Sequence, residues 1–397
     1  MAASSDPLCI GLVGPAQDQP CGIADYVRRL EPALADRCHL IHASYHQALN
    51  DPALDGCRAL LVHYERTLVP GPDYLAALSA RHPGRVFIMP HEVYAEDPFA
   101  FPYASIRSAF PPLLWLKRLR YRWRHREYAR EQALQGRGYD AARVVPLSRE
   151  GGDILRSRAD APDIAARILP PVPIARFDLP VGPRGPAGGA LKASLFPAGP
   201  RAVVGIYGFL NPGLDYASAF DLIESLGRDT ALVLLGGERA GYRVAGSLEA
   251  EAGRRGLGDR FKITGYLAES SLADHLGLCD FFLCPMRFKS SSASILQLFR
   301  LGKSILVPAG PLTTYLRDEG APLDLYANPR ELLELGRAIL EGRHRRPEDR
   351  YRWDFAAVAE AYLKAVEMSV PDMPASASAT LQPGKLPPGG RGGSVVE

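Results

Sequence analysis

Short apolar runs separated by helix-like stretches recur along the chain in two successive blocks. The runs of the first block are CIGLVG (9–14), CHLIHA (38–43), ALLVHY (59–64), RVFIMP (85–90) and RVVPLS (143–148). Those of the second are RAVVGIYGF (201–209), ALVLLGG (231–237), RFKITGYL (260–267), DFFLCP (280–285) and SILVPAG (304–310). This alternation indicates parallel sheets covered by helices. We therefore expect an α/β protein with two doubly wound, Rossmann-like domains facing a central cleft, with ligands at the carboxyl ends of the strands.

The length of 397 residues exceeds the size at which one core stops growing, which also favours two domains. Proline and glycine concentrate between the blocks, in PPVPIARFDLPVGPRGPAGGA, and indicate a linker without a helix or strand. The chain end lacks periodicity and is expected to be disordered. The predicted segments are an N-terminal Rossmann-like domain (1–175), the linker (176–200), a C-terminal Rossmann-like domain (201–350), a last ordered segment (351–370) and the tail (371–397).

Composition excludes several classes of protein. A net charge of +3 is too small to favour a nucleic-acid partner. Six cysteines are scattered without a CxxC pair, which predicts reduced thiols in a cytoplasmic protein. No apolar segment approaches the roughly 18 residues that a membrane span needs, and the N-terminus has no basic region of a signal peptide.

Common catalytic motifs are also missing from the sequence. No GxGxxG follows a strand, and GxxxxGK[ST], HExxH and GxSxG do not occur. The sequence therefore contains none of the motifs that usually identify dinucleotide oxidoreductases, P-loop enzymes, zinc proteases or serine hydrolases. No acidic DxD pair near a strand end offers a divalent-ion site, so we expect no metal.

Four segments carry a family resemblance, which covers about residues 9–367. The segments are CIGLVGP with CGIADYVRRL, PHEVY (90–94), RFKITGYLAESSLADHLGLCDFFLCPMRF (260–288) and RWDFAAVAEAYLKAV (352–366). In this order they resemble the retaining GT-B glycosyltransferases of family 4, also called group 1. The resemblance implies a GT-B fold and a hexosyltransferase-like enzyme of glycan, glycoconjugate or polysaccharide biosynthesis. Such an enzyme transfers a sugar from a nucleotide-sugar donor to a hydroxyl acceptor with retention, without metal or cofactor.

The resemblance also implies roles for the segments and for single residues. Residues 1–175 would be the acceptor-side domain, residues 201–350 the nucleotide-sugar-binding domain, and residues 351–370 a closing helix that crosses back to the first domain. The catalytic candidates are His91 and Lys289. The donor-binding candidates are Gly22, Tyr207, Gly208, Phe209, Tyr266, Leu267, Arg287, Ser292, Ala293, Ser294 and Gln297. The acceptor-side candidates are Glu92, His63 and Glu65. In the family, the loop that contains the serines presents backbone N–H groups to the donor diphosphate, an arrangement that suits an anion.

Three positions depart from the family pattern. Alignment on Gly302-Lys303 puts Lys289 and Gln297 where the family has two glutamates, and Phe209 stands where it has an arginine that neutralises the diphosphate. The lysine that usually follows a few residues later is absent. Lys289, with Arg287, could supply the missing positive charge from the other side of the diphosphate, or Lys289 could be a solvated loop lysine; both interpretations stay open.

Some residues outside this loop also allow two interpretations. His91 and Glu92 could hold a turn rather than contact substrate, and Gly22 could serve only turn geometry. The basic segment 113–130, LLWLKRLRYRWRHREYAR, could bind the inner face of a membrane, where a lipid-linked acceptor would lie, or pack its aromatic face on its own domain. A non-catalytic GT-B protein that binds a nucleotide sugar or a protein partner is the alternative function. A GT-B enzyme of another reaction, such as a nucleotide-sugar epimerase, is the less favoured one, because CGIADY resembles the transferases more closely.

Overall fold

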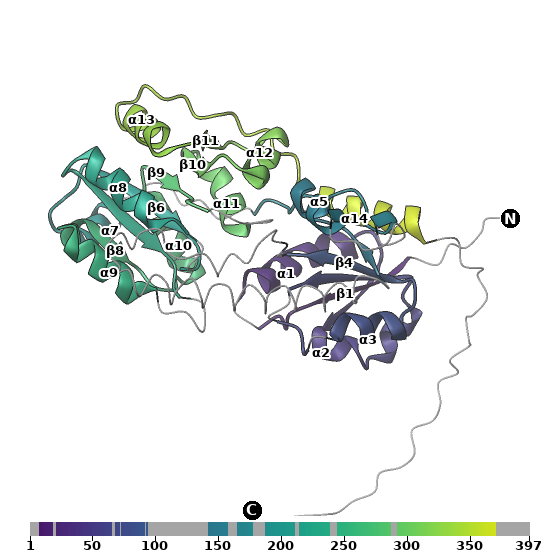
Figure 1. The fold of residues 1–397 in the computed structure, drawn as a ribbon. Coiled ribbons are helices and arrows are strands. Elements are labelled where there is room, and N and C mark those ends of the chain that lie inside the picture. Colours follow the sequence, from purple (N-terminus) through teal and green to yellow (C-terminus); the bar gives the residue numbers. More distant parts are fainter. Residues whose placement is uncertain are drawn as a thin grey trace, which may run out of the picture.

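The computed structural model describes residues 8–18, 21–65, 68–71, 73–91, 93, 142–157, 165–177, 187–210, 214–238, 244–286 and 292–370. Within these ranges the chain forms two parallel sheets, each flanked by helices (Figure 1). The two-domain Rossmann-like architecture expected from the sequence is therefore confirmed. The predicted membrane-contacting segment 113–130 and the predicted disordered tail 371–397 lie outside the described residues.

The first sheet has five strands in the order β2-β1-β3-β4-β5, all parallel. Its central strands are apolar and almost wholly buried, as strands covered on both faces must be. The order reverses between β1 and β3, which makes the carboxyl ends of these two strands a topological switch point. The strands are β1 (Cys9–Gly14), β2 (His39–Ser44), β3 (Ala59–Tyr64), β4 (Val86–Pro90) and β5 (Arg143–Val144).

Helices of the first domain follow from the same periodicity. In α1 the buried residues include Tyr26, Leu30 and Leu34, spaced to lie on one face of the helix against the sheet. The Cys21 side chain caps the helix by accepting a hydrogen bond from the Ala24 N–H at 3.3 Å. The helices of this domain are α1 (Gly22–Ala35), α2 (Tyr45–Ala48), the 3₁₀ helix η1 (Pro52–Gly56), α3 (Tyr74–Arg81) and α5 (Arg149–Ser157).

The second sheet has six strands in the order β11-β10-β9-β6-β7-β8, again all parallel. Read from the other edge, this is the 3-2-1-4-5-6 order of a dinucleotide-type Rossmann sheet, with its switch point between β6 and β9. The strands are β6 (Ala202–Tyr207), β7 (Thr230–Leu235), β8 (Phe261–Ile263), β9 (Phe281–Leu283), β10 (Ile305–Pro308) and β11 (Asp324–Tyr326).

The helices of the second domain cover both faces of this sheet. They are α8 (Tyr216–Leu226), α9 (Ala245–Arg254), η2 (Gly258–Arg260), α10 (Glu269–Leu278), α11 (Ala293–Leu298), η3 (Phe299–Leu301), α12 (Pro311–Asp318) and α13 (Pro329–Leu340). A further helix, α7 (Ala187–Leu195), packs against α10. The expectation that residues 176–200 contain no regular element is therefore wrong for these nine residues, where alanines and leucines outweigh two glycines in helix propensity.

The closing helix is α14 (Phe355–Ser369), which packs against α1 of the first domain (Figure 1). The chain passes between the domains twice, and the two passages are hydrogen-bonded to each other. The backbone N–H of Arg176 donates to the carbonyl of Trp353 at 2.8 Å, and the buried Tyr351 hydroxyl donates to the carbonyl of Ile174 at 2.7 Å. The predicted return of the chain end to the first domain is thus built on specific contacts.

Candidate functional site

The switch point of the second sheet brings together residues that follow β6, β7 and β8 with the start of α11. Gly208 follows β6 with a φ of 123°, a conformation that favours glycine. A Cβ atom on Gly208 would lie 3.2 Å from both Cβ and Oγ of Ser294 in the first turn of α11. The sequence predicted both residues as donor-binding, and the structure places them in contact.

Two further glycines extend this edge. A Cβ atom on Gly236, which follows β7, would come within 2.0 Å of the carbonyl oxygen of Gly208, so the two backbones touch. A Cβ atom on Gly237 would lie 3.0 Å from the backbone nitrogen of Tyr266, which follows β8. The Gly208 N–H donates to the Leu235 carbonyl at 3.1 Å, and the Gly237 carbonyl accepts from the Leu210 N–H at 2.9 Å. These glycines therefore allow the segments after β6, β7 and β8 to converge at the carboxyl edge of the sheet.

Two aromatic side chains are exposed beside these glycines. Tyr266 is 71% exposed and Phe209 is 38% exposed. In the part of the chain that the structure describes, only one other large apolar side chain is exposed. Their predicted neighbours in the site, Tyr207 at the end of β6 and Leu267 after Tyr266, are partly buried. An exposed aromatic face at a ligand edge can stack on a planar ring or on a sugar face.

The start of α11 supplies the remaining described donor-side candidates. The Ser292 side chain is buried, and its Oγ lies 3.2 Å from the Oγ of Ser294. Ser292 precedes α11 without making a side-chain cap, and Ala293 and Gln297 are partly buried on the helix. Arg287 and Lys289, the predicted cations of this loop, lie outside the described residues.

Lys303 has a structural role instead. Its ammonium group donates hydrogen bonds to the carbonyls of Leu276, Gly277 and Cys279, at 3.3 Å and 2.6 Å for the first two. These carbonyls lie at the carboxyl end of α10, where a cation stabilises the helix terminus. Lys303 therefore anchors the end of α10. It directly follows Gly302, which ends η3 with a left-handed φ of 67°.

At the switch point of the first sheet, Gly22 begins α1. Its φ is not among the positive values found at ten other glycines of the described chain, and a Cβ atom there would meet nothing within 4 Å. Neither backbone geometry nor packing therefore requires glycine at this position. The close approach of a ligand at Gly22 stays a prediction.

His63 and His91 form a buried pair at the ends of β3 and β4. The Nδ1 of His63 lies 3.0 Å from the Nε2 of His91, and the Tyr26 ring packs on both imidazoles with centroids 5.4 Å and 5.7 Å away. Burial lowers the pKa of His91 to about 3. Burial, with the neighbouring His91 imidazole, lowers the pKa of His63 well below its usual range. Both imidazoles are therefore neutral near pH 7 and act as hydrogen-bonding groups rather than cations.

The other acceptor-side candidates lie nearby or cannot be placed. Glu65 directly follows β3 and is buried, beside the Tyr45 hydroxyl that donates to the carbonyl of His63. Glu92 lies outside the described residues. The structure thus gathers Gly22, His63, Glu65 and His91 at the carboxyl ends of β1, β3 and β4, as the sequence predicted for strand-end residues.

Sequence reasoning missed Gly236, Gly237 and Glu238. The Glu238 carboxylate accepts hydrogen bonds from the backbone N–H groups of Val244 and Ala245, the latter at 2.7 Å, and so holds the start of α9. The signal was present, since two glycines end the apolar run ALVLLGG. Nothing local, however, shows that they touch Gly208, 28 residues earlier.

The described residues contain no group of three or more histidine, cysteine, aspartate or glutamate side chains arranged to hold a metal ion. Across the same parts of the chain, no helix is both long enough and apolar enough to cross a bilayer.

Comparison with known proteins gives a fold but no sequence family. No protein-family model matches the sequence, and no curated protein matches it either. Solved structures do match. HepE of Anabaena, in complex with UDP and glucose, superposes with a TM-score of 0.58 at 14% identity, covering 91% of this chain and 100% of HepE.

Two more neighbours agree. The catalytic domain of starch synthase IV from Arabidopsis thaliana, bound to ADP and acarbose, has a TM-score of 0.59 at 12% identity, covering 92% of this chain and all of that one. WaaG, a glycosyltransferase involved in lipopolysaccharide biosynthesis, has a TM-score of 0.54 at 14% identity, covering 91% of this chain and 99% of WaaG. With its two parallel sheets, the chain has the two-domain Rossmann-like GT-B fold. Its structural neighbours are GT-B glycosyltransferases.

Proposed function

We propose that the protein is a glycosyltransferase that moves a sugar from a nucleotide-sugar donor to a hydroxyl acceptor. The observation that carries the proposal is the switch point of the second sheet. There Gly208, Gly236 and Gly237 allow the segments after β6 and β7 to meet beside Ser294 and the exposed Tyr266 ring. The N–H groups of a first helical turn, such as the turn of α11 that carries Ser294, suit a diphosphate, and an aromatic ring suits a base or a sugar. One edge therefore offers both kinds of contact that a nucleotide sugar needs.

The neighbours add support of the same kind. HepE is crystallised with UDP, with UDP and glucose, and with UDP-glucose, and starch synthase IV with ADP and acarbose. Proteins of this fold thus bind nucleotides and sugars, which is what the proposal requires of this chain. The proposed reaction retains the anomeric configuration, serves glycan or glycoconjugate synthesis and uses neither metal nor cofactor. The proposed location is the cytoplasm.

The chemistry follows from the groups on each side. In the proposed front-face reaction, the acceptor hydroxyl forms a bond to the anomeric carbon as the bond to the diphosphate oxygen breaks, and that oxygen takes the hydroxyl proton. His91 is neutral and its Nε2 is engaged by His63, so it orients a hydroxyl by hydrogen bonding and does not serve as a cation. Gly22 leaves room for the ligand at the start of α1.

This reaction requires a positive charge that neutralises the leaving diphosphate. Phe209 replaces the family arginine, and Lys303 is committed to the carbonyls at the end of α10. We propose that Lys289, with Arg287, neutralises the diphosphate, because preorganised positive charge commonly lowers the barrier of such reactions more than any other effect. Gln297, on α11, would bind the ribose hydroxyls through its amide.

The test combines binding with product analysis. We expect one nucleoside diphosphate to raise the melting temperature in a screen of UDP, ADP and GDP, since a ligand of the folded state stabilises it by mass action. The matching nucleotide sugar should release free nucleotide when an acceptor is present, and NMR of the product should show a retained anomeric configuration. No stabilisation by any nucleotide or nucleotide sugar would refute the proposal.

Variants connect this test to the site. Gly22→Val adds a side chain in open space, so it should leave the melting temperature nearly unchanged and weaken donor binding about tenfold or more. Gly253→Val, late in α9 and equally open, is the matched control and should bind the donor normally. Lys289→Ala should weaken binding of the nucleoside diphosphate; unchanged affinity would identify Lys289 as a solvated loop residue.

A non-catalytic GT-B protein is the second candidate function. The observation that favours it is the exposed Phe209 in place of the arginine, together with the engagement of Lys303 at α10. This function predicts that a nucleotide sugar binds and stabilises the fold but is not turned over with any acceptor. The screen and the product analysis thus separate the two functions.

A further inference from the structure

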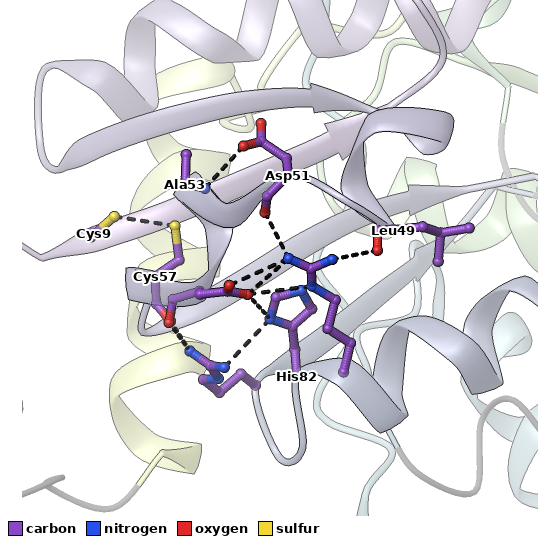
Figure 2. Close-up of polar contacts among 9 residues, drawn as sticks. Cys9, Leu49, Asp51, Ala53, Cys57 and His82 are labelled. Carbon is purple, nitrogen blue, oxygen red and sulfur yellow. Dashed lines mark hydrogen bonds and ion pairs between the residues drawn. The ribbon is translucent and has the colours of Figure 1, made fainter. Parts of the chain in front are cut away.

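Two thiols of the first domain lie within bonding reach of each other. The Sγ atoms of Cys9 and Cys57 are 3.1 Å apart, although 48 positions separate the residues in the chain. Figure 2 shows the sulfur atom of Cys9, at the start of β1, facing that of Cys57, in the turn between η1 and β3. A disulfide requires an S–S distance of about 2.05 Å and Cα atoms about 4.4–6.8 Å apart. The sulfurs therefore need to move by only about 1 Å to bond.

The backbones are already held in register for that bond. Cys9 opens β1, and its carbonyl accepts a hydrogen bond from the Arg58 N–H at 2.8 Å. Ile10 pairs with Ala59 in the parallel β1–β3 ladder, so Cys57 lies one residue before the position opposite Cys9. A strand spacing of about 4.8 Å and a rise of about 3.3 Å then put the two Cα atoms about 6 Å apart. This spacing lies inside the disulfide range.

A polar network fixes the turn that carries Cys57. Asp51 caps η1 by accepting from the Ala53 N–H at 2.9 Å, and Arg81 binds the Leu49 carbonyl at 2.6 Å and the Asp55 carboxylate at 3.2 Å (Figure 2). Arg85 donates to the carbonyls of Asp55 and Cys57 at 2.7 Å and 3.0 Å. These contacts hold Cys57 in place, so the 3.1 Å distance between the Cys9 and Cys57 sulfur atoms is fixed by the hydrogen-bonded turn.

The two thiols differ in accessibility. Cys9 is partly exposed, whereas the Cys57 side chain is buried beside Leu54 and above Gly11. Burial raises the pKa of the Cys57 thiol, so this thiol stays protonated in the reduced protein. An oxidant arriving from solvent therefore meets Cys9 first.

We propose that Cys9 and Cys57 are a redox-active pair that forms a reversible disulfide by exchange with a low-molecular-weight disulfide. The Cys9 thiolate attacks the small disulfide and forms a mixed disulfide, releasing one small thiolate. The released small thiolate takes the proton of the Cys57 thiol, and the Cys57 thiolate then attacks the Cys9 sulfur. The bond between Cys9 and the small thiol breaks, and the second small thiolate leaves and takes a proton from water. The two protein thiols are oxidised to one disulfide, and the small disulfide is reduced to two thiols.

The bond would tie together the first β-α-β unit of the fold. It would close a loop that contains most of β1, all of α1, β2 and α2, and the 3₁₀ turn η1. Cys9 and Cys57 lie at the amino ends of β1 and β3, opposite the carboxyl ends that carry Gly22, His63 and Glu65. The pair therefore stabilises the domain without entering the proposed substrate site.

The experiment uses the full chain in glutathione buffers of graded oxidised-to-reduced ratio. After acid quenching, the protein is alkylated in denaturant and its peptides are mapped by mass spectrometry. We expect a linked peptide pair containing Cys9 and Cys57, four alkylated cysteines of the six, and a melting temperature raised by about 5 °C or more in the oxidised protein. Wild-type protein alone gives this result, so no variant has to fold.

Variants sharpen the outcome. Cys57→Ser should leave Cys9 as a glutathione mixed disulfide, and Cys9→Ser should abolish the linked pair. Cys38→Ser is the matched control and should keep both the link and the rise in melting temperature, because the Cys38 thiol donates to the Leu34 carbonyl at 3.2 Å. Alkylation of both Cys9 and Cys57 in protein quenched from the most oxidising ratio, or a link from Cys9 to another cysteine, would overturn the proposal. Nucleotide binding should be the same in both redox forms, so this test is independent of the proposed function.

Discussion

The His63–His91 pair shows how burial sets the chemistry of single residues in this protein. Two imidazoles 3.0 Å apart share at most one proton between them while both are neutral. Protonating either one would put a cation in an apolar cluster beside Tyr26, Phe177 and Phe355. The same arrangement that orients His91 therefore makes the folded state sensitive to acid.

The pH dependence of stability follows from this arrangement. Both histidines have folded-state pKa values below the unfolded value of about 6.5, so the unfolded chain binds more protons below that pH. Their full contribution to stability is present above pH 6.5 and is lost as the pH falls towards 3. Over this range the unfolded chain binds up to about two more protons at this pair than the folded chain, so the free energy of unfolding falls as the pH is lowered.

Urea denaturation between about pH 7 and pH 4.5 measures this loss. His91→Gln should make the pH dependence shallower by about one bound proton, and exposed His39→Gln should leave it unchanged. An unaltered slope in the His91 variant would show that the imidazole is not buried and neutral in solution.

At the scale of elements, Lys303 belongs to a short sequence that resembles a glycosyltransferase motif but has a structural role. Gly302-Lys303 served to align the chain with the glycosyltransferase pattern, yet the lysine binds carbonyls at the end of α10. Lys303→Met should destabilise the protein by about 1.5–3 kcal/mol, because charge-assisted hydrogen bonds to buried carbonyls are lost. Nucleotide affinity should be unchanged. Lys192→Met, which removes one exposed bond to the Arg201 carbonyl, is the control and should have little effect on stability.

Chemical denaturation and nucleotide titration of the same variants test this assignment. A Lys303 variant that is stable but has lost nucleotide binding would reverse it and place the ammonium group at the diphosphate.

How far the sequence predicts the elements depends on their length. The runs at 9–14 and 59–64 coincide with β1 and β3, because a short run of mostly apolar residues between polar stretches leaves few other interpretations. The three-residue strand β11 was not predicted, since Asp324–Tyr326 is too short for a pattern. The run at 260–267 was predicted longer than β8, because the chain turns at Gly265, with a φ of 73°, to form the candidate site.

The candidate site was predictable in its positions and not in its contacts. Strand-end residues such as Gly208 and His63 stand out because their apolar runs stop there. The contacts of Gly208 with Gly236 and of Cys9 with Cys57 join segments far apart in the chain, so their partners depend on strand order and register. Burial of the His63–His91 pair depends further on α14, which arrives from the end of the described chain.

For the whole molecule, Tyr351 couples the domains. Its hydroxyl donates to the Ile174 carbonyl at 2.7 Å, and its ring packs edge-on against Phe299 with centroids 5.3 Å apart. Tyr351→Phe should lower the free energy of unfolding by about 1–2 kcal/mol, since a buried carbonyl loses its donor. Urea denaturation followed by circular dichroism measures this change.

Tyr74→Phe provides the control for that measurement. The Tyr74 hydroxyl is buried in the first domain without a hydrogen-bond partner among the described residues, so its removal should be neutral or stabilising. Equal effects of the two substitutions would mean that the Tyr351 hydrogen bond adds nothing to stability.

The paired passages between the domains also limit how the molecule can move. Arg176 binds Trp353 through its backbone and the Tyr351 carbonyl through its guanidinium at 3.0 Å, so both passages bend together. Two segments of the chain that run side by side and are hydrogen-bonded to each other behave as a hinge with one axis. Such a hinge allows the domains to rotate and resists their sliding past each other. Opening and closing of the two domains should therefore follow a single arc, and any substrate held between them would meet the same opposing residues at every closure.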